Sequence, residues 1–592
     1  MRFSGLRAVT ILPLVALVLA ACGGGTSGGN KITGGVATFA ELPAATPSYI
    51  LPMTSCKYFS VTNLSQFIEL MYRPLYWFGQ NGQVKLNSDL SLASDPVYTD
   101  GGKTVTMKLK NWKWSDGTPI TSRDVQFWMN LYKANLGGYC GYTPKYFPDN
   151  VTSMSYPDPQ TVVFSLDKPY GSYWFTYNEL SQITPMPQHA WDKTSDSSPV
   201  GNYDMDPKTA VDVYKYLDGQ SKTLGTFATN PLWQVVSGPW KLKSFSTEGA
   251  VAMIPNPGYS GPVKPTIAEF DLQPYTTGTA EFNVLHSGGI DYGYIPTESV
   301  SQKDSLTKYT FEPWIGWQFV YFQENFNNAT NGAMYKQLYF RQAMQHLVDQ
   351  TTWISQIFKG YAVPTYGPVP IQPASQFVSP GERTNPYPYD PAAAIKLLTD
   401  NGWTVNAGGV STCSNPGTGT GQCGAGIASG QKASIKLEYA SGTIAVTQEM
   451  EALKTAFSKA GLELNLSENP FNTVIGDAFG GTTTSDMDNW GGGWIYAPDY
   501  EPTGESLFST GAGSNGGAYS DSKMDDLITA STTSNDVQAL YAYEDYNAQQ
   551  LPVIFIPSAD AALTMAKKTL HGWNPQDPLL QIYPENWYFT SS

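Results

Sequence analysis

The sequence predicts a protein of the α/β or α+β class, because segments with helix periodicity are interspersed with segments of strand character. Its 592 residues are enough for two to four domains, since a domain usually contains about 100–200 residues. Hydrophobic residues make up 41% of the chain, which is too many for a wholly disordered protein. The 35 basic and 50 acidic side chains give a formal net charge of −15. This excess of acid argues against nucleic acid as a partner, because phosphate binding needs clustered Lys and Arg.

Four segments have the periodicity of helices, and two of them carry clear start signals. Thr121 and Asp124 form a capping-box pattern before an apolar face. Asp390 followed by Pro391 offers an N-cap and a first helical position. The expected helices begin at Thr121, run from Asp390 to a stop at Gly402, and cover about 334–358 and 447–460.

Strands are expected where apolar and polar residues alternate or β-branched residues gather. These segments are 104–109, 161–166, 435–439 and 462–466. Residues 408–430 contain few apolar side chains, so we expect a surface loop or insertion there.

The N-terminus has the pattern of a secretory signal peptide. Arg2 and Arg7 precede an apolar run that is too short to span a bilayer core, which takes about 20 residues. The run ends in Leu-Ala-Ala-Cys at Cys22, which resembles a bacterial lipobox; an ordinary signal peptide with an incidental Cys is the alternative. We expect residues 1–21 to be removed, Cys22 to be lipidated and residues 22–30 to form a flexible Gly/Ser linker. The protein is then exported and lipid-anchored on the outer face of the cell membrane, or in the periplasm.

Four further cysteines favour disulfides over metal binding. In an oxidising compartment an even number permits two bridges, with three possible connectivities. Cys413 and Cys423 flank a Gly/Ser/Thr-rich loop, so a local bridge is the simplest pairing, and Cys56 with Cys140 follows by elimination. Metal binding is the rival interpretation, but no His lies near any of the four in the sequence.

Sequence patterns of catalysis are mostly absent. The four histidines, at positions 189, 286, 346 and 571, have no spacing that would form a metal pair. No Gly-x-Ser-x-Gly nucleophile elbow occurs. We therefore expect a protein that is not an enzyme and that uses no metal and no cofactor.

Six short motifs follow one another in a fixed order along the chain. They are Tyr72-Arg73-Pro74-Leu75, Trp114-Ser115-Asp116-Gly117-Thr118-Pro119, Ser237-Gly238-Pro239-Trp240, Asn256-Pro257-Gly258-Tyr259, Arg341-Gln342-Ala343 through Asp349, and Tyr389-Asp390-Pro391 through Gly402-Trp403. Together they resemble the family 5 extracellular solute-binding proteins, the dipeptide- and oligopeptide-binding lipoproteins of bacterial ABC importers. The resemblance covers most of residues 34–590.

This resemblance implies a two-lobed fold of the type II periplasmic-binding-protein class, with an extra domain inserted in lobe one. The implied division is a discontinuous lobe one (31–72, 222–312 and 545–592), an inserted subdomain (73–221) and lobe two (313–544). It also implies a protein that encloses an oligopeptide between its lobes, hands it to ABC permease subunits and performs no chemistry itself. We expect it to act as a monomer.

The segment 490–502 is the strongest candidate for the ligand site. Its glycines let the backbone approach a ligand beside the flat faces of Trp490, Trp494 and Tyr500. It resembles the family's "Gly-Trp … Asp-Tyr-x-x-Pro" element, whose Asp holds the α-ammonium of the peptide, and the matching residue is Asp499. The spacing between Trp and Asp departs slightly from that pattern, so Glu501 and Asp488 are the alternative acids.

A second candidate wall contains Trp314 and Trp317, at the expected entry into lobe two. Tandem aromatic residues there line a cleft or form a buried strand, and the sequence does not decide between the two.

Other functions compete with peptide binding. An oligosaccharide-binding protein of the same family would use the many Trp and Tyr residues to stack on sugar faces and needs no buried acid. A secreted hydrolase, from another class, would need a carboxylate pair, and Asp486 with Asp488 is the close acidic pair of interest. Binding of nickel or haem is disfavoured because His and Arg are scarce, and a purely structural surface lipoprotein would have no cleft.

Overall fold

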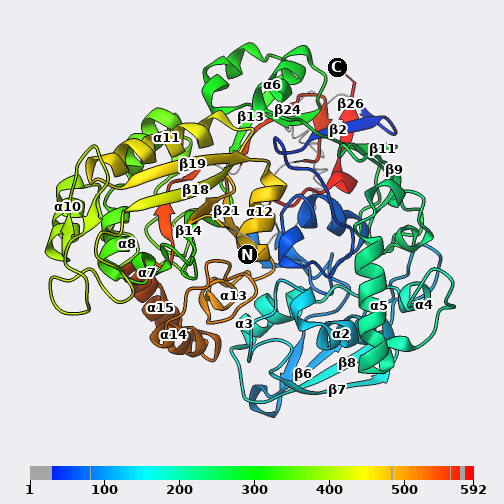
Figure 1. Cartoon of the computed structure of the whole chain (residues 1–592). Helices are drawn as coiled ribbons and strands as arrows, with labels where there is room; N and C mark the ends of the chain where they lie inside the picture. Colours follow the sequence, from blue (N-terminus) through cyan, green and yellow to red (C-terminus); the bar gives the residue numbers. More distant parts are fainter. Residues whose placement is uncertain (1–29, 81, 482–483, 560–561, 574–579, 592) are drawn as a thin grey trace, which may run out of the picture.

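The computed structural model describes residues 30–80, 82–481, 484–559, 562–573 and 580–591. The expected signal peptide, the lipidation site Cys22 and almost all of the linker lie outside these residues. The chain forms two lobes, each built around its own sheet, with lobe two on the left and lobe one on the right of Figure 1. Among the described helices, none has the length and apolar character needed to cross a membrane.

Lobe one is built on a seven-stranded mixed sheet whose strands come from distant parts of the chain. In sheet order they are β13 (Tyr309–Trp314), β24 (Ala562–Lys567), β12 (Tyr292–Tyr294), β2 (Val36–Ala40), β11 (Glu269–Gln273), β10 (Val251–Pro255) and β9 (Trp240–Phe245). β2 is parallel to both of its neighbours, and the other pairs are antiparallel. The helix α6 (Gly278–Ser287) contacts β12, and a small sheet of β1 (Lys31–Ile32), β26 (Tyr588–Thr590) and β25 (Leu570–His571) joins the two ends of the described chain.

An insert in lobe one, residues 97–220, has a four-stranded antiparallel sheet of its own, at the lower right of Figure 1. Its strands are β5 (Val97–Thr99), β6 (Thr104–Lys108), β8 (Thr161–Leu166) and β7 (Val151–Asp158), and its helices are α2 (Ser122–Ala134), α3 (Ser172–Trp174), α4 (Gln188–Trp191) and α5 (Pro207–Gln220). The expected capping box is confirmed: the Thr121 side chain accepts from the first helical turn while its amide donates to Asp124 Oδ2 over 2.8 Å. A short hairpin of β3 (Phe78–Gln80) and β4 (Gln83–Leu86) and the short helix α1 (Glu69–Met71) precede the insert.

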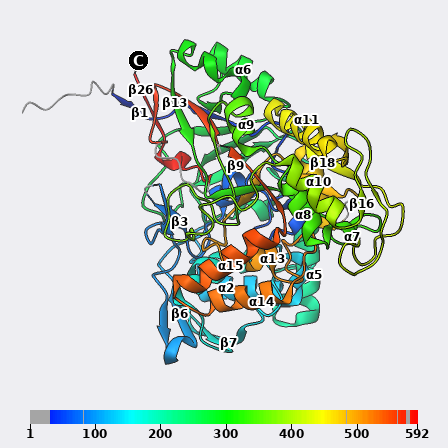
Figure 2. The same ribbon diagram turned by 90° about the vertical axis from the view of Figure 1, so that its left-hand side faces the viewer.

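Lobe two is built on a six-stranded sheet. Its strands are β19 (Glu463–Asn469), β18 (Ser434–Ala440), β20 (Met487–Asn489), β14 (Gln318–Glu324) and β21 (Gly493–Ile495), with β22 (Ile554–Ile556) paired to β14. The covering helices include α8 (Leu338–Gln345), α10 (Pro391–Asp400), α11 (Ile444–Lys459), α12 (Phe471–Gly480), α13 (Glu505–Phe508), α14 (Ser522–Thr532) and α15 (Val537–Gln550). α11 and α12 contact the sheet, and α14 and α15 pack beside each other below it, as Figure 2 shows. Two-stranded pairs complete the lobe: β15 (Ala362–Val363) with β23 (Ser558–Ala559), and β16 (Trp403–Thr404) with β17 (Thr412–Cys413).

One expected helix is wrong. The segment 334–358 is not continuous but is divided into α7 (Gly332–Tyr335), α8, α9 (Gln350–Thr352) and a wider helical turn at Trp353–Ile357. The backbone of Gln337 is extended, which ends the first piece, and Asp349 starts a new helix by accepting a hydrogen bond from the amide of Thr352. The apolar periodicity continued across these breaks and concealed them.

Two strands fall on the other side of the expected lobe boundaries. β22, expected in lobe one, is in the sheet of lobe two because Ile556 pairs with Val320 of β14. β13 runs past the expected lobe boundary at residue 312 to Trp314, which pairs with Ala562 in the sheet of lobe one. The connections between the lobes therefore lie at about 315–317 and after Ile556.

The structure joins the four described cysteines in two disulfides. Cys413 is bonded to Cys423 inside the loop of 408–430, and both residues are buried although most of the loop is exposed. Cys56 is bonded to Cys140 and ties the N-terminal part of lobe one to the insert.

Candidate functional site

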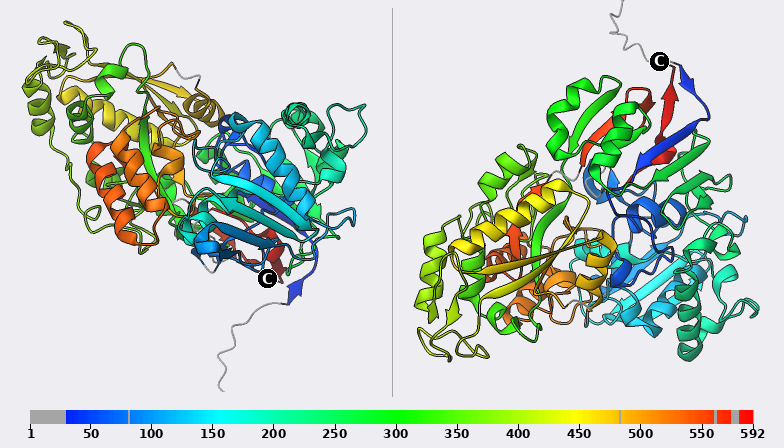
Figure 3. Two further views of the ribbon diagram at one scale, coloured as in Figure 1. Left: turned by 90° about the horizontal axis from the view of Figure 1, so that it is seen from below. Right: turned by 45° about the horizontal axis from the view of Figure 1, so that its top comes forward.

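A cavity of about 310 Å³ lies between the two lobes. Lobe one contributes the loops after β2 and β12, the segment 59–65 and α6, whereas lobe two contributes the end of β18, α11, α12 and the segment 489–497. Most of the lining is apolar, with Phe59, Leu64, Val446, Ile475, Phe479 and Trp490 among its side chains. Figure 3 shows the lobes side by side, with the blue N-terminal segments of lobe one next to α12 of lobe two.

The segment after β20 owes its shape to two glycines. β20 and β21 both pair with β14, so the chain leaves the sheet at Trp490 and returns to it at Gly493. Gly491 has a φ of +76°, which favours glycine, and a Cβ on Gly493 would lie 1.8 Å from the backbone oxygen of Phe319. This detour places the backbone of 491–493 and both tryptophans at the cavity wall.

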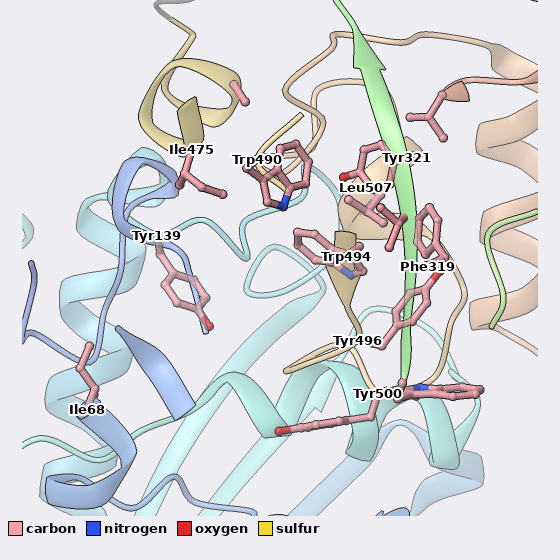
Figure 4. Close-up of a cluster of buried hydrophobic side chains, with 14 of the residues drawn as sticks. Ile68, Tyr139, Phe319, Tyr321, Ile475, Trp490, Trp494, Tyr496, Tyr500 and Leu507 are labelled. Atoms are coloured by element: carbon pink, nitrogen blue, oxygen red, sulfur yellow. The ribbon is translucent and has the colours of Figure 1, made fainter. Parts of the chain in front are cut away.

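Trp490 and Trp494 line the cavity from lobe two (Figure 4). The Trp490 ring meets the Tyr321 ring edge to face, with centroids 5.3 Å apart. The Trp494 ring stacks on Phe59 of lobe one, with centroids 5.8 Å apart and an angle of 19° between the planes. The Phe59–Trp494 stack therefore bridges the two lobes.

Asp499 lies beside this stack in a smaller cavity of about 20 Å³. Phe59 and Trp494 line both cavities, so the smaller one adjoins the larger. Oδ2 of Asp499 accepts hydrogen bonds from Trp494 Nε1 over 3.0 Å and from Ser506 Oγ over 2.5 Å, whereas Oδ1 is buried and has no hydrogen-bond partner. Burial raises the pKa of this carboxyl well above its usual value, and the negative charge of Glu505 raises it further.

Two further acids line the small cavity, and sequence reasoning missed both. Glu505, on α13, accepts hydrogen bonds from Trp174 Nε1, Asn178 Nδ2 and Thr503 Oγ1. Glu179 comes from the insert and is only 2% exposed. No sequence motif announces these residues, because they and Asp499 meet only when the insert packs against lobe two.

The described residues that line the large cavity do not include three other expected site residues, Tyr500, Trp317 and Trp314. Tyr500 is buried and stacks on Phe78 with ring centroids 4.1 Å apart. Trp317 is buried in the core and donates its Nε1 hydrogen to the backbone oxygen of Tyr500. Trp314 ends β13 in the sheet of lobe one.

The alternative acids occupy different surroundings. Glu501 is mostly buried beside the insert, and burial followed by the charge of Glu505 raises its pKa to about 8. Asp488 is fully buried in β20, and Asp486 accepts a hydrogen bond from the backbone amide of Lys436 over 2.7 Å. Neither Asp486 nor Asp488 is among the described residues that line the two cavities.

Comparisons with known proteins identify the family. Residues 90–514 match the family model of the bacterial extracellular solute-binding proteins, family 5. Protein XP55 of Streptomyces lividans is 25% identical over 413 residues, which are 66% of this chain and 64% of that protein. The dipeptide-binding protein of Lactococcus lactis is 25% identical over 477 residues, 76% of either chain.

A solved structure shows the same fold. The oligopeptide-binding protein AppA of Bacillus subtilis, in complex with a nonapeptide, superimposes with a TM-score of 0.74 at 18% identity. The match covers 95% of this chain and all of that one. The fold is therefore that of the two-lobed periplasmic binding proteins.

Proposed function

The chain belongs to the bacterial extracellular solute-binding proteins, family 5, and from this premise we propose that it captures oligopeptides between its lobes and delivers them to the permease of an ABC importer. In this proposal the protein is not an enzyme, and Cys22 carries the lipid that holds it at the membrane. The name of the dipeptide-binding relative supports the peptide class of ligand. So does the nonapeptide held by the fold relative AppA.

The observation that carries the proposal is the environment of Asp499. One of its carboxylate oxygens is buried without a partner, at the side of an interlobe cavity. A peptide α-ammonium is a matching group, since opposite unit charges 4 Å apart attract by about 4 kcal/mol at an effective dielectric constant near 20. The positive charge of the ammonium would also offset the free-energy cost of burying this carboxylate without a partner.

Backbone groups of lobe two supply a second feature that suits a peptide. β21 is the last strand in its sheet order and pairs with β14 alone among the described strands. Its residues line the large cavity together with Ala440 and Ser441 at the end of β18. An open strand edge can hydrogen-bond the main chain of an extended peptide whatever its side chains, which favours broad specificity.

An oligosaccharide remains the second candidate because Trp490 and Trp494 both line the cavity. Flat sugar faces stack on such rings and make no use of a buried carboxylate. This ligand would leave Asp499 without a function in binding.

A thermal-shift screen of the protein lacking residues 1–30 separates the two ligand classes. A ligand at 100 times its dissociation constant adds about 2.7 kcal/mol to the free energy of unfolding. We expect short peptides to raise the melting temperature and oligosaccharides to leave it unchanged. A rise with oligosaccharides alone would contradict peptide capture and assign the site to sugar binding.

A further inference from the structure

The small cavity beside Asp499 is assembled from two parts of the molecule. The insert contributes Asn178, Glu179 and Gln182, and lobe two contributes Asp499 and Ser506. Asn178 locks the two parts together: its Nδ2 donates to Glu505 Oε1 over 2.6 Å and to the Glu501 oxygen over 2.9 Å, and its Oδ1 accepts from the Glu501 amide over 2.9 Å. Glu179, the next residue in the chain, lines the same cavity as Asp499.

Three acceptor oxygens on residues lining this cavity are buried without a hydrogen-bond partner. They are Asp499 Oδ1, Glu179 Oε1 and Gln182 Oε1. Asp499 and Glu179 are 7% and 2% exposed, so water does not reach them freely. Unsatisfied buried acceptors are costly, by about 1–3 kcal/mol for a neutral group and more for a charged one. Three of them around one cavity indicate a missing donor.

A cation would supply such a donor. Among the described residues that line the small cavity, none is Lys, Arg or His, and no ion pair is formed by its acids. The pKa of Glu179 is raised well above its usual value by burial and then by the charge of Glu505, an effect that the Phe147 amide, Asn150 and Gln182 partly offset. The pKa of Asp499 is raised as well. A bound positive charge would stabilise the ionised form of both carboxyls.

We propose that Glu179 and Gln182 of the insert form the second half of the ammonium site, so that one primary ammonium of the ligand donates its three hydrogens to Asp499, Glu179 and Gln182. This inference rests on the proposed peptide function and extends it to further residues that bind the ammonium of the ligand. An ammonium has three donors and no acceptor, which matches three unpartnered oxygens.

The size of the cavity sets the specificity. A volume of about 20 Å³ has room for one group of the size of a water molecule, which needs roughly 10–15 Å³. A primary ammonium fits, whereas an N-methyl group on the same nitrogen adds bulk and removes a donor. The site therefore selects ligands with an unsubstituted amino terminus.

The test is calorimetric titration of the protein with Ala-Ala-Ala and with its N-methylated form. We expect wild type to prefer the unmethylated peptide by about 10-fold or more, since one hydrogen bond to a charged group contributes about 1.5–3 kcal/mol. Glu179→Gln should weaken binding of Ala-Ala-Ala by about 10- to 100-fold and reduce this preference. Gln182→Met should weaken it less, because it removes a neutral acceptor.

Glu324→Gln is the matched control, because Glu324 is also a buried acid with a raised pKa but is not among the described residues that line the two cavities. It should bind Ala-Ala-Ala within about twofold of wild type. Thermal unfolding of each variant shows whether it is folded, and Gln182→Met provides the readout if Glu179→Gln does not fold.

Two results overturn the inference in distinguishable ways. If Asp499→Asn abolishes binding while Glu179→Gln and Gln182→Met bind like wild type, the ammonium site is confined to lobe two and the insert has no part in it. If wild type binds neither peptide, the proposed peptide function fails and this inference fails with it.

Discussion

Gly493 shows how one residue determines the position of the cavity wall. Its Cα lies so close to β14 that a Cβ would overlap the backbone oxygen of Phe319, so the sheet pairing that positions Trp494 depends on the absence of a side chain. Trp494 in turn donates to Asp499 and stacks on Phe59. Backbone pairing, aromatic contact and carboxylate orientation therefore depend on the same short segment.

Gly493→Ala should lower the free energy of unfolding by about 1–3 kcal/mol, the usual cost of overpacking, and should also weaken ligand binding because Trp494 is displaced. Gly492→Ala is the matched control, since its Cβ would meet nothing closer than 3.7 Å. Urea denaturation of both variants checks the difference. Equal stability of the two would contradict the importance of the Gly493 contact.

At the scale of elements, the sequence contained enough local signals to predict many helices and strands. The helix after Thr121 and the helix from Asp390 begin at caps that the structure confirms, and β8 has the bounds that were expected. The third helix starts at Ile444, a few residues before the expected 447. The long helix at 334–358 was wrong, because one break is the extended backbone of Gln337 and another is the new helix start at Asp349, and neither interrupts the apolar periodicity.

The candidate site was only partly predictable for a similar reason. Trp490 and Trp494 belong to one conspicuous segment and do line the cavity. Trp317 and Tyr500 are also aromatic, but they pack in the core. Glu179 lies in the insert and joins the small cavity only through tertiary packing, which no local pattern encodes.

The bridge between Cys413 and Cys423 should stabilise its loop without acting on the ligand site. The loop packs near Trp403 and Tyr339, and none of its residues is among those that line the two cavities. Replacing both cysteines by Ser should lower the free energy of unfolding by about 2–4 kcal/mol and leave peptide affinity unchanged. Denaturation and calorimetry on the same variant measure the two quantities, and a large loss of affinity would show an unforeseen coupling to the site.

At the scale of the whole molecule, buried carboxyls outside ion pairs make stability depend on pH. Burial raises the pKa of Glu281 to about 8 and that of Glu69 to about 7, from 4.5 in each case, and Glu501 is likewise raised to about 8. A carboxyl with a raised pKa in the folded state binds its proton more tightly there than in the unfolded chain. Its contribution is therefore fully present below pH 4.5 and is lost as the pH rises through the folded value.

The peptide-free protein should accordingly become less stable between about pH 5 and pH 8. Urea denaturation at the two pH values measures the change in the free energy of unfolding. Glu281→Gln should reduce the slope, because it removes one of these titrating groups. A protein that gains stability over this interval would contradict the assignment of protonated carboxyls to the folded state.

The lobes meet through the Phe59–Trp494 stack, the contacts of Asn178 and the backbone hydrogen bond from Gly278 to Gly442. Each of these residues lines one or both of the cavities. A ligand that binds there touches both lobes, which is how a solute-binding protein couples capture to the relative position of its lobes.

Calorimetric titration of wild type and Asp499→Asn with one peptide, in its free and its N-acetylated form, tests directly whether Asp499 binds the peptide ammonium. We expect the free peptide to bind wild type, and acetylation or Asp499→Asn to weaken binding by roughly 30- to 4,000-fold, since removing one partner of a buried charge pair costs about 2–5 kcal/mol. Acetylation should cost little more in Asp499→Asn. Equal affinity of wild type for the free and acetylated peptides would contradict an ammonium site at Asp499.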